Sequence, residues 1–167
     1  DTPLKYNADS GYLGTAVPGG EEILKITPFD RIIYVRKSGI YTVTEAPAKV
    51  FVGPELRYCG FADKESLSKV LFSVIYRDPQ TQYVYVKRCK VGGYIMNRDY
   101  FFAPDGMEVL FVETRKGFNF TLNYVKKPKM KILKESFKAS DFAEKGIKAQ
   151  GVRVVAKEVQ SVVVEKK

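Results

Sequence analysis

Histidine is absent from the 167 residues, and only two cysteines, Cys59 and Cys89, are present. Without histidine, catalytic arrangements of the Ser/His/Asp or Cys/His kind and zinc sites built on Cys/His clusters are excluded. Two isolated cysteines are too few for a disulfide framework, so we expect both thiols to be reduced. An enzyme built on this chain would have to use carboxylates, lysine or tyrosine.

Long apolar runs are missing as well. No run approaches the roughly 20 residues that a membrane-spanning helix requires, and no segment has the basic, apolar and small-residue order of a signal peptide. We therefore expect no membrane partner and a location in a bacterial cytoplasm, associated with the nucleoid. The chain begins at Asp1 and enters a structured pattern almost at once, which indicates a piece of a longer protein.

Positive charge is in clear excess, with 28 Lys and Arg against 19 Asp and Glu and a formal net charge of +9. Such an excess favours an acidic partner such as nucleic acid. The carboxylates Glu21, Glu22 and Asp78 form no repeated cluster of the kind that Mg²⁺ needs, so we expect neither a metal nor a cofactor. The length suits a single domain over residues 1–167.

Three segments repeat one pattern about every 40 residues. Each has an apolar strand, a tight polar turn and an alternating, aromatic-rich strand, and they span residues 32–43, 70–88 and 109–124. Repeated hairpins of this kind predict an all-β, propeller-like fold of about three blades. Capping residues predict short helical turns at 63–68 and 140–145.

The segments between and after the hairpins add further strands. The connectors 46–63 and 91–106 are rich in glycine and proline but keep aromatic residues, so we expect short blade strands there. The run 126–134 alternates lysine with apolar residues, which predicts an outer strand with one basic face. The β-prone segment 159–164 would risk aggregation if unpaired, and we expect it to pair with 11–17.

Four short segments of the chain carry a resemblance to a known family. Gly-Tyr-Leu-Gly-Thr at 11–15, Asp-Arg-Ile-Ile-Tyr-Val-Arg-Lys-Ser-Gly at 30–39, Lys-Val-Phe-Val-Gly at 49–53 and Lys-Gly-Ile-Lys-Ala-Gln-Gly at 145–151 occur in that order. This succession resembles the C-terminal domain of type IIA topoisomerase A subunits, and topoisomerase IV more than gyrase. The resemblance covers nearly the whole chain.

The resemblance implies a β-pinwheel, in which blades exchange strands and a basic outer rim binds and bends duplex DNA. It also implies two protein partners, the breakage-reunion domain of the same chain and the ATPase subunit of an ATP-dependent parent enzyme. The glycine-rich basic box of gyrase, Q-R-R-G-G-K-G, has no counterpart here, so gyrase-type chiral wrapping is not expected. With about three blades, we expect an open arc.

Basic residues at the turns are the candidate binding site. We expect Arg36 and Lys37 to occupy a hairpin turn equivalent to that of Arg115 and Lys116. Cations repeated in this way meet successive phosphates without reading bases. The alternatives are solvated strand ends and, for the lysine run, an edge strand that lysines protect from pairing. The predicted DNA-binding residues are Arg36, Lys37, Lys87, Arg88, Lys90, Arg115, Lys116, Lys126, Lys127, Lys129, Lys131 and Arg153.

A rival interpretation is an RNA-binding or protein-binding β-module. In that case Tyr41, Tyr83, Tyr85 and Phe120 would form an exposed platform that stacks on bases or side chains, so their burial distinguishes the two functions. Tyr100 follows Arg98 and Asp99, and a tyrosine beside an arginine is a candidate for a DNA-cleaving nucleophile. Its aromatic neighbours favour a packing role instead. No catalytic residue is predicted.

Overall fold

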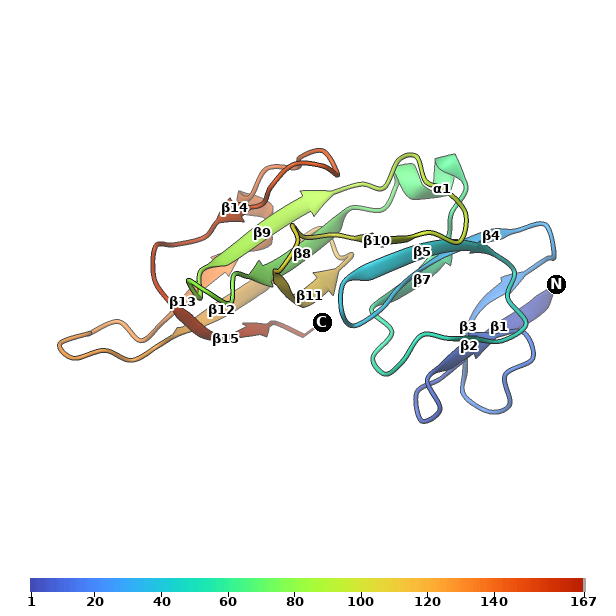
Figure 1. Ribbon diagram of the computed structural model, residues 1–167, viewed down its shortest axis with the longest axis horizontal. Coiled ribbons are helices and arrows are strands. Elements are labelled where there is room, and N and C mark those ends of the chain that lie inside the picture. Colours follow the sequence, from blue (N-terminus) through green and yellow to red (C-terminus); the bar gives the residue numbers. More distant parts are fainter. Residues whose placement is uncertain (167) are drawn as a thin grey trace. The chain divides into compact units, whose positions relative to one another are not determined.

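The computed structural model describes residues 1–166, which fall into two compact units (Figure 1). Unit 1 comprises Asp1–Val70 and Val91–Phe102, and unit 2 comprises Leu71–Lys90 and the chain from Ala103 onward. The architecture is all-β, with four small antiparallel sheets, one five-residue helix and one 3-10 turn in the described residues. The single domain and the open arc stay predictions.

Unit 1 contains two sheets of four strands. The first has the order β3-β1-β2-β6, and its strands are β1 (Thr2–Asn7), β2 (Tyr12–Gly14), β3 (Glu21–Ile26) and β6 (Val50–Phe51). The second has the order β10-β5-β4-β7, and its strands are β4 (Arg31–Val35), β5 (Ile40–Glu45), β7 (Tyr58–Phe61) and β10 (Asp99–Phe101). The helix α1 (Lys64–Ser68) begins as expected, because the Asp63 carboxylate accepts the Ser66 N–H at 3.2 Å.

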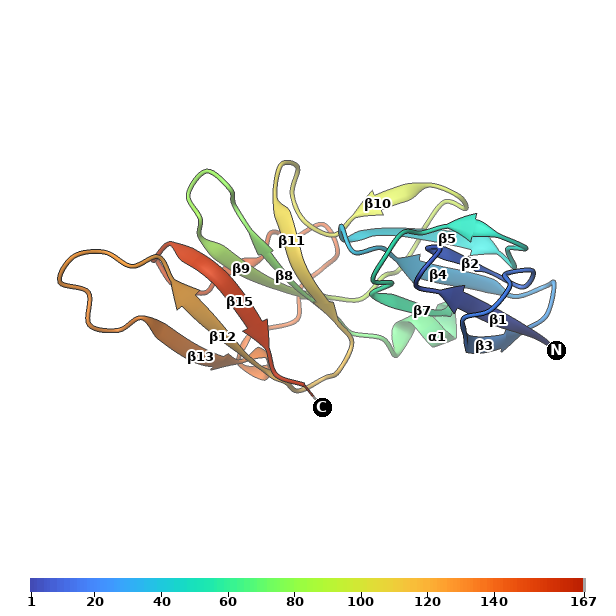
Figure 2. The same cartoon turned by 90° about the horizontal axis from the view of Figure 1, so that it is seen from below.

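Unit 2 contains the other two sheets (Figure 2). The third sheet has the order β11-β8-β9-β14, and its strands are β8 (Phe72–Arg77), β9 (Val84–Cys89), β11 (Glu108–Glu113) and β14 (Val152–Arg153). The fourth has the order β13-β12-β15, and its strands are β12 (Asn119–Tyr124), β13 (Lys134–Lys138) and β15 (Val159–Val164). A 3-10 turn at Ala139–Asp141 stands where a longer helical turn was expected.

One connection rule builds all four sheets. Each is centred on a hairpin, namely β1–β2, β4–β5, β8–β9 and β12–β13, and the next long strand after each hairpin pairs with its first strand. In the first three sheets a short strand from beyond the following hairpin pairs with the second strand. We call β6, β10 and β14 the exchanged strands. The strand exchange that the resemblance implied is therefore present, with four sheets rather than three.

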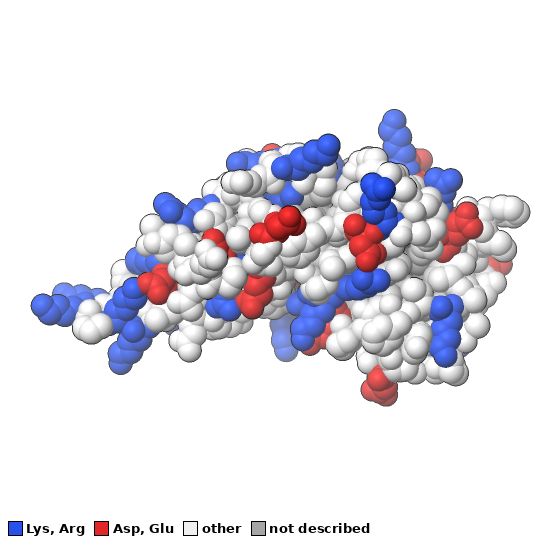
Figure 3. All heavy atoms as spheres, in the orientation of Figure 1, with Lys and Arg blue, Asp and Glu red and all other residues white. Residues whose placement is uncertain are grey.

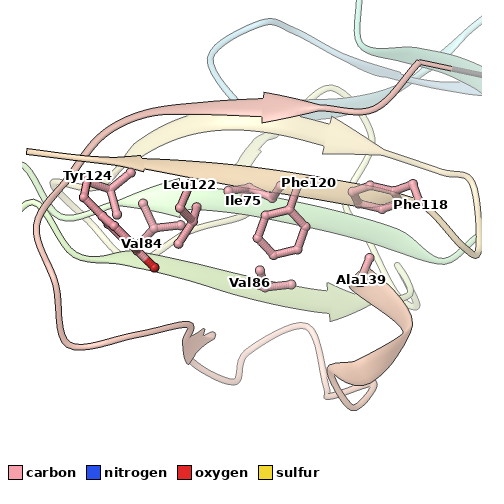
Figure 4. Packing of buried hydrophobic residues seen from close by; sticks show 9 residues of the cluster. Ile75, Val84, Val86, Phe118, Phe120, Leu122, Tyr124 and Ala139 are labelled. Atoms are coloured by element: carbon pink, nitrogen blue, oxygen red, sulfur yellow. The ribbon is translucent and has the colours of Figure 1, made fainter. Parts of the chain in front are cut away.

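Alternation along β12 explains the core of unit 2. Phe120, Leu122 and Tyr124 are buried, while the intervening Asn119, Thr121 and Asn123 are not. The buried side chains pack against Ile75 of β8 and against Val84 and Val86 of β9 (Figure 4). One core cluster of unit 1 is formed by Leu4, Leu13, Ile26, Ile32, Tyr34 and Val52.

Two strand pairings and the extent of one strand differ from the sequence predictions. The segment 109–124 is not a hairpin, because β11 pairs with β8 while β12 belongs to the next sheet. The terminal strand β15 pairs with β12 rather than with 11–17, since the alternating apolar face of β12 lies next to it in unit 2. Residues 125–133 form a loop rather than an outer strand, and β13 begins only at Lys134.

Candidate nucleic-acid interface

Charge is divided unequally between the two units. Unit 2 has 18 Lys and Arg against 9 Asp and Glu, whereas unit 1 has 10 of each. The net charge of +9 therefore belongs entirely to unit 2, and unit 1 is formally neutral. An excess of positive charge favours attraction to an anionic polymer, and this excess lies in unit 2.

The loop between β12 and β13 carries the densest group of cations in unit 2. Lys126, Lys129 and Lys131 are exposed, and no ion pair with the described residues is recorded for any of them. The loop turns where the Met130 N–H donates to the Lys127 carbonyl at 3.2 Å and Lys129 adopts a φ of 66°. Basic side chains cover this projecting loop in Figure 3. Lys127 differs from its neighbours, because its ammonium pairs with Glu158.

Two further cations of unit 2 are exposed. The Arg153 guanidinium lies 5.3 Å from the centroid of the Tyr83 ring, which holds it by a cation–π contact without neutralising it. Lys116 is exposed in the link between β11 and β12. Among the predicted DNA-binding residues, these two and the three lysines of the loop are exposed, and no ion pair with the described residues is recorded for them. We call Lys116, Lys126, Lys129, Lys131 and Arg153 the free cations.

Four other predicted residues already have acidic partners. In unit 1, Arg36 lies 3.5 Å from Asp99, and Lys37 lies 3.5 Å from Glu55. In unit 2, Lys90 and Glu144 approach to 3.8 Å. Arg115 pairs with Glu113 at 3.0 Å and also donates to the Glu165 carbonyl at 2.6 Å. Each would have to exchange a protein carboxylate for a phosphate, which reduces its contribution to binding an anion.

Lys87 and Arg88 are buried, with only 4% and 7% of their surface exposed. Arg88 donates to Ser73 Oγ at 3.0 Å and to the carbonyls of Phe142 and Lys116 at 3.2 and 2.7 Å. The Lys87 ammonium donates to the Ile147 carbonyl, and burial lowers its pKa. Both lie on β9, a central strand covered by its neighbours, so they hold unit 2 together and face no open surface for a phosphate.

The expected equivalence of two basic turns is wrong. Arg36 and Lys37 do lie at a hairpin turn, between β4 and β5. Arg115 and Lys116 instead lie in a link that leads from one sheet to the next. Under the connection rule, the counterpart of the Arg36–Lys37 turn is the loop between β12 and β13.

Unit 2 has further exposed lysines that the sequence prediction omitted. These side chains are exposed, and no ion pair with the described residues is recorded for them. Counting charge separately for 103–167 would have signalled them, because most of the basic excess lies in that segment. They are Lys134, Lys138, Lys145, Lys148 and Lys166.

The aromatic residues of the rival interpretation do not form an exposed platform. Tyr41 and Phe120 are only 3% and 1% exposed. Tyr85 stacks on the buried Tyr76 at 5.2 Å between ring centroids, and Tyr83 lies beneath Arg153. Tyr100 stacks on Tyr41 at 5.2 Å, and its hydroxyl accepts the Ile95 N–H at 2.8 Å, so it packs as expected.

The described residues contain neither a metal-ligand cluster nor a membrane-spanning helix. Within residues 1–166, no three side chains of the His, Cys, Asp or Glu type gather as a metal site would require. In the same part of the chain, no helix is both long enough and apolar enough to cross a membrane.

Strand exchange between small antiparallel sheets, together with a basic unit, defines a β-pinwheel-like domain. Comparison with protein families agrees with this class. The model of the topoisomerase C-terminal domain of Bacteroidota matches residues 3–167, and the chain therefore belongs to that family. A search of curated proteins found no match. The family match confirms the resemblance to a topoisomerase C-terminal domain and a role in a topoisomerase.

Proposed function

We propose that unit 2 binds and bends duplex DNA without sequence preference. The observation that carries this proposal is the charge division, since the whole excess of positive charge lies in unit 2 together with the free cations. Lysines on a projecting loop suit phosphates rather than base edges, because an ammonium group on a flexible chain has no fixed geometry for reading a base.

The parent, in this proposal, is an ATP-dependent type II topoisomerase, and the chain belongs to a subunit of the topoisomerase IV A type. DNA cleavage then takes place in the breakage-reunion domain, and ATP is hydrolysed by the ATPase subunit. The present domain presents DNA to the cleavage core and needs no cofactor for that task. Its place in the cell is the bacterial cytoplasm, at the nucleoid.

The energetics of bending are compatible with a few phosphate contacts. Bending a short duplex site by tens of degrees costs on the order of a few kcal/mol. Each neutralised phosphate releases condensed counterions, and several such contacts offset that cost. Because the basic box of gyrase is missing, we expect bending with little constrained supercoiling.

The first test is the salt dependence of binding by the 167-residue chain. If the five free cations each neutralise one phosphate, log K should fall with log salt at a slope of about −4.5. Two duplexes of unrelated sequence should give the same curve. Salt-independent binding, a strong preference for one duplex, or tighter binding of single-stranded RNA would contradict the proposal.

A second test locates the contact. The triple variant Lys126→Gln, Lys129→Gln, Lys131→Gln should weaken duplex binding more than tenfold and reduce the salt slope by about 3. Its melting temperature should stay nearly constant, since exposed charges contribute little to stability. The matched control removes the same charge from unit 1 through exposed lysines, as Lys25→Gln, Lys64→Gln, Lys69→Gln. Equal losses in both variants would mean that net charge alone explains binding.

A further inference from the structure

The first and third sheets share a turn that places a tyrosine beside the start of the second hairpin strand. Gly11 and Gln82 have positive φ values of 79° and 60°. Their N–H groups each donate to the carbonyl four residues earlier, at 2.8 and 2.7 Å. The next residue is Tyr12 in the first sheet and Tyr83 in the third, so the two tyrosines occupy equivalent positions.

The exchanged strands meet these two turns in the same register. In the first sheet, Val50 of β6 pairs with Leu13, the residue after the tyrosine. In the third sheet, the Val154 N–H donates at 2.9 Å to the carbonyl of Val84, which is again the residue after the tyrosine. The residues that directly precede Val50 and Val154 are therefore equivalent to each other as well.

Both of these preceding residues are cations. The Lys49 ammonium lies 4.5 Å from the centroid of the Tyr12 ring, and the Arg153 guanidinium lies 5.3 Å from that of the Tyr83 ring. Lys49 is exposed, and no ion pair with the described residues is recorded for it. Each cation is held by a ring that does not neutralise its charge. Lys49 thus has in unit 1 the same surroundings that Arg153 has in unit 2.

The second sheet keeps the exchanged strand but not the cation. In the same register, Asp99 stands where the first sheet has Lys49, and Ile40 stands where it has the tyrosine. The Asp99 carboxylate accepts a hydrogen bond from the Thr42 hydroxyl at 2.6 Å. A carboxylate repels a phosphate, so the second sheet offers no equivalent contact.

We propose that Lys49, positioned by the Tyr12 ring, is a phosphate contact of unit 1 equivalent to Arg153 of unit 2. This assignment rests on the proposed function, because the ligand is the backbone of duplex DNA. A lysine already held on a ring loses less side-chain freedom on binding than one surrounded by solvent. If Lys49 and the five free cations contact one duplex, the expected slope of log K against log salt changes from about −4.5 to about −5.4.

Chemical modification of lysines tests the contact directly. The 167-residue chain is treated with an amine-specific acetylating reagent with and without saturating duplex, and mass spectrometry gives the rate at each lysine. Duplex should slow the modification of Lys49 at least threefold. Lys25 is the matched control, since it is exposed on β3, at the opposite edge of the same sheet, and its rate should not change. Equal protection of Lys49 and Lys25 would overturn the proposal.

A charge variant measures the same contact in solution. Lys49→Gln should reduce the salt slope by about 0.9 and weaken duplex binding about fivefold at about 0.1 M salt. Arg153→Gln should have the same effect, and Lys25→Gln should have little. The melting temperature of Lys49→Gln should stay nearly constant, since the side chain is exposed. A lower melting temperature with unchanged binding would make Lys49 a structural residue and overturn the proposal.

Two substitutions of Tyr12 separate position from charge. Tyr12→Phe keeps a ring beside the ammonium and should bind duplex like the unchanged chain. Tyr12→Leu removes the ring but no charge, so it should weaken binding about threefold without changing the salt slope. Tyr12 also contacts the Phe51 ring, at 5.3 Å between centroids, so the melting temperature of each variant is measured as well. Identical binding by the two variants would overturn the role of the ring.

Failure of the proposed function can be distinguished from failure of this contact. Protection of Lys129 in the modification experiment reports duplex on the loop of unit 2. Protection of Lys129 without protection of Lys49 would overturn the Lys49 contact and leave DNA binding by unit 2 intact. Absence of duplex binding by the unchanged chain would overturn both.

Discussion

At the residue scale, some basic side chains of unit 2 are buried and structural whereas others are exposed. Residue type alone does not distinguish the two groups. Arg88 lies in the interior and uses three of its nitrogens on Ser73, Phe142 and Lys116. The Lys116 side chain is exposed, and only the backbone carbonyl of Lys116 accepts a hydrogen bond from Arg88. One residue is part of the fold, and the other is part of the surface that we propose for DNA.

We expect Arg88→Met to lower the free energy of unfolding by about 3 kcal/mol, because it leaves two carbonyls and a hydroxyl without a donor in the interior. Lys116→Met should change it by less than about 0.5 kcal/mol, since it alters only an exposed side chain. Urea unfolding followed by circular dichroism measures both. Similar values for the two variants would show that Arg88 is not structural.

The two thiols predict a dependence of stability on pH. Burial raises the pKa of Cys59 to about 12 and that of Cys89 to about 11. Between pH 9 and 11 the unfolded chain loses thiol protons that the folded chain keeps, so the free energy of unfolding falls as pH rises. The stabilisation by the protonated thiols is present below pH 9. From pH 8 to 10 we expect the free energy of unfolding to fall by about 1 kcal/mol per thiol.

The matched variant is Cys59→Ala, Cys89→Ala. Urea unfolding at pH 8 and pH 10 should show a smaller decline in this variant than in the unchanged chain. An identical decline would assign the effect to other groups, such as tyrosines. The buried Cys89 thiol should also resist a thiol reagent at pH 8 in the folded chain and react in urea.

At the scale of elements, the exchanged strands are short and depend on what lies beside them. β14 has only two residues, yet it closes the third sheet against β9. Directly before it, the Gly151 N–H donates to the Tyr76 hydroxyl at 2.8 Å, and Tyr76 is buried. Glycine is required because a Cβ at this position would lie 2.8 Å from the Tyr76 ring.

We therefore expect Gly151→Ala to loosen β14 and to destabilise unit 2 by about 1–3 kcal/mol, as overpacking usually does. Hydrogen exchange at Val154, whose N–H donates to the Val84 carbonyl at 2.9 Å, should become faster. Gly146→Ala is the control, since nothing lies within 4 Å of a Cβ there. Unchanged exchange at Val154 would mean that Tyr76 moves aside at no cost.

At the scale of the whole molecule, the uneven charge should affect stability as well as binding. Unit 2 carries all of the net positive charge, so its folded state includes self-repulsion that unit 1 lacks. Added salt screens this repulsion. We expect hydrogen exchange in β8, β9 and β12 to slow more than exchange in β1, β4 and β5 when salt is raised from 0.05 to about 0.5 M. Equal slowing would contradict the charge division.

Local patterns in the sequence were sufficient to predict much of the fold. Hairpins at 32–43 and 70–88, the Asp63 cap and the inward face of β12 follow from periods and turn residues that depend on neighbours along the chain. The order of short segments was also sufficient to predict the family, and the match to residues 3–167 confirms that prediction. These features need no knowledge of distant contacts.

Only the tertiary structure decided how the strands are shared and which cations are exposed. An alternating strand such as β12 satisfies its period with any partner, so the sequence pattern does not distinguish β11 from β13 and β15. Likewise, Arg88 is buried because Ser73, Phe142 and Lys116 converge on it from three separate segments. Strand pairing and charge burial depend on contacts between residues far apart in sequence, and those contacts form only when the sheets assemble.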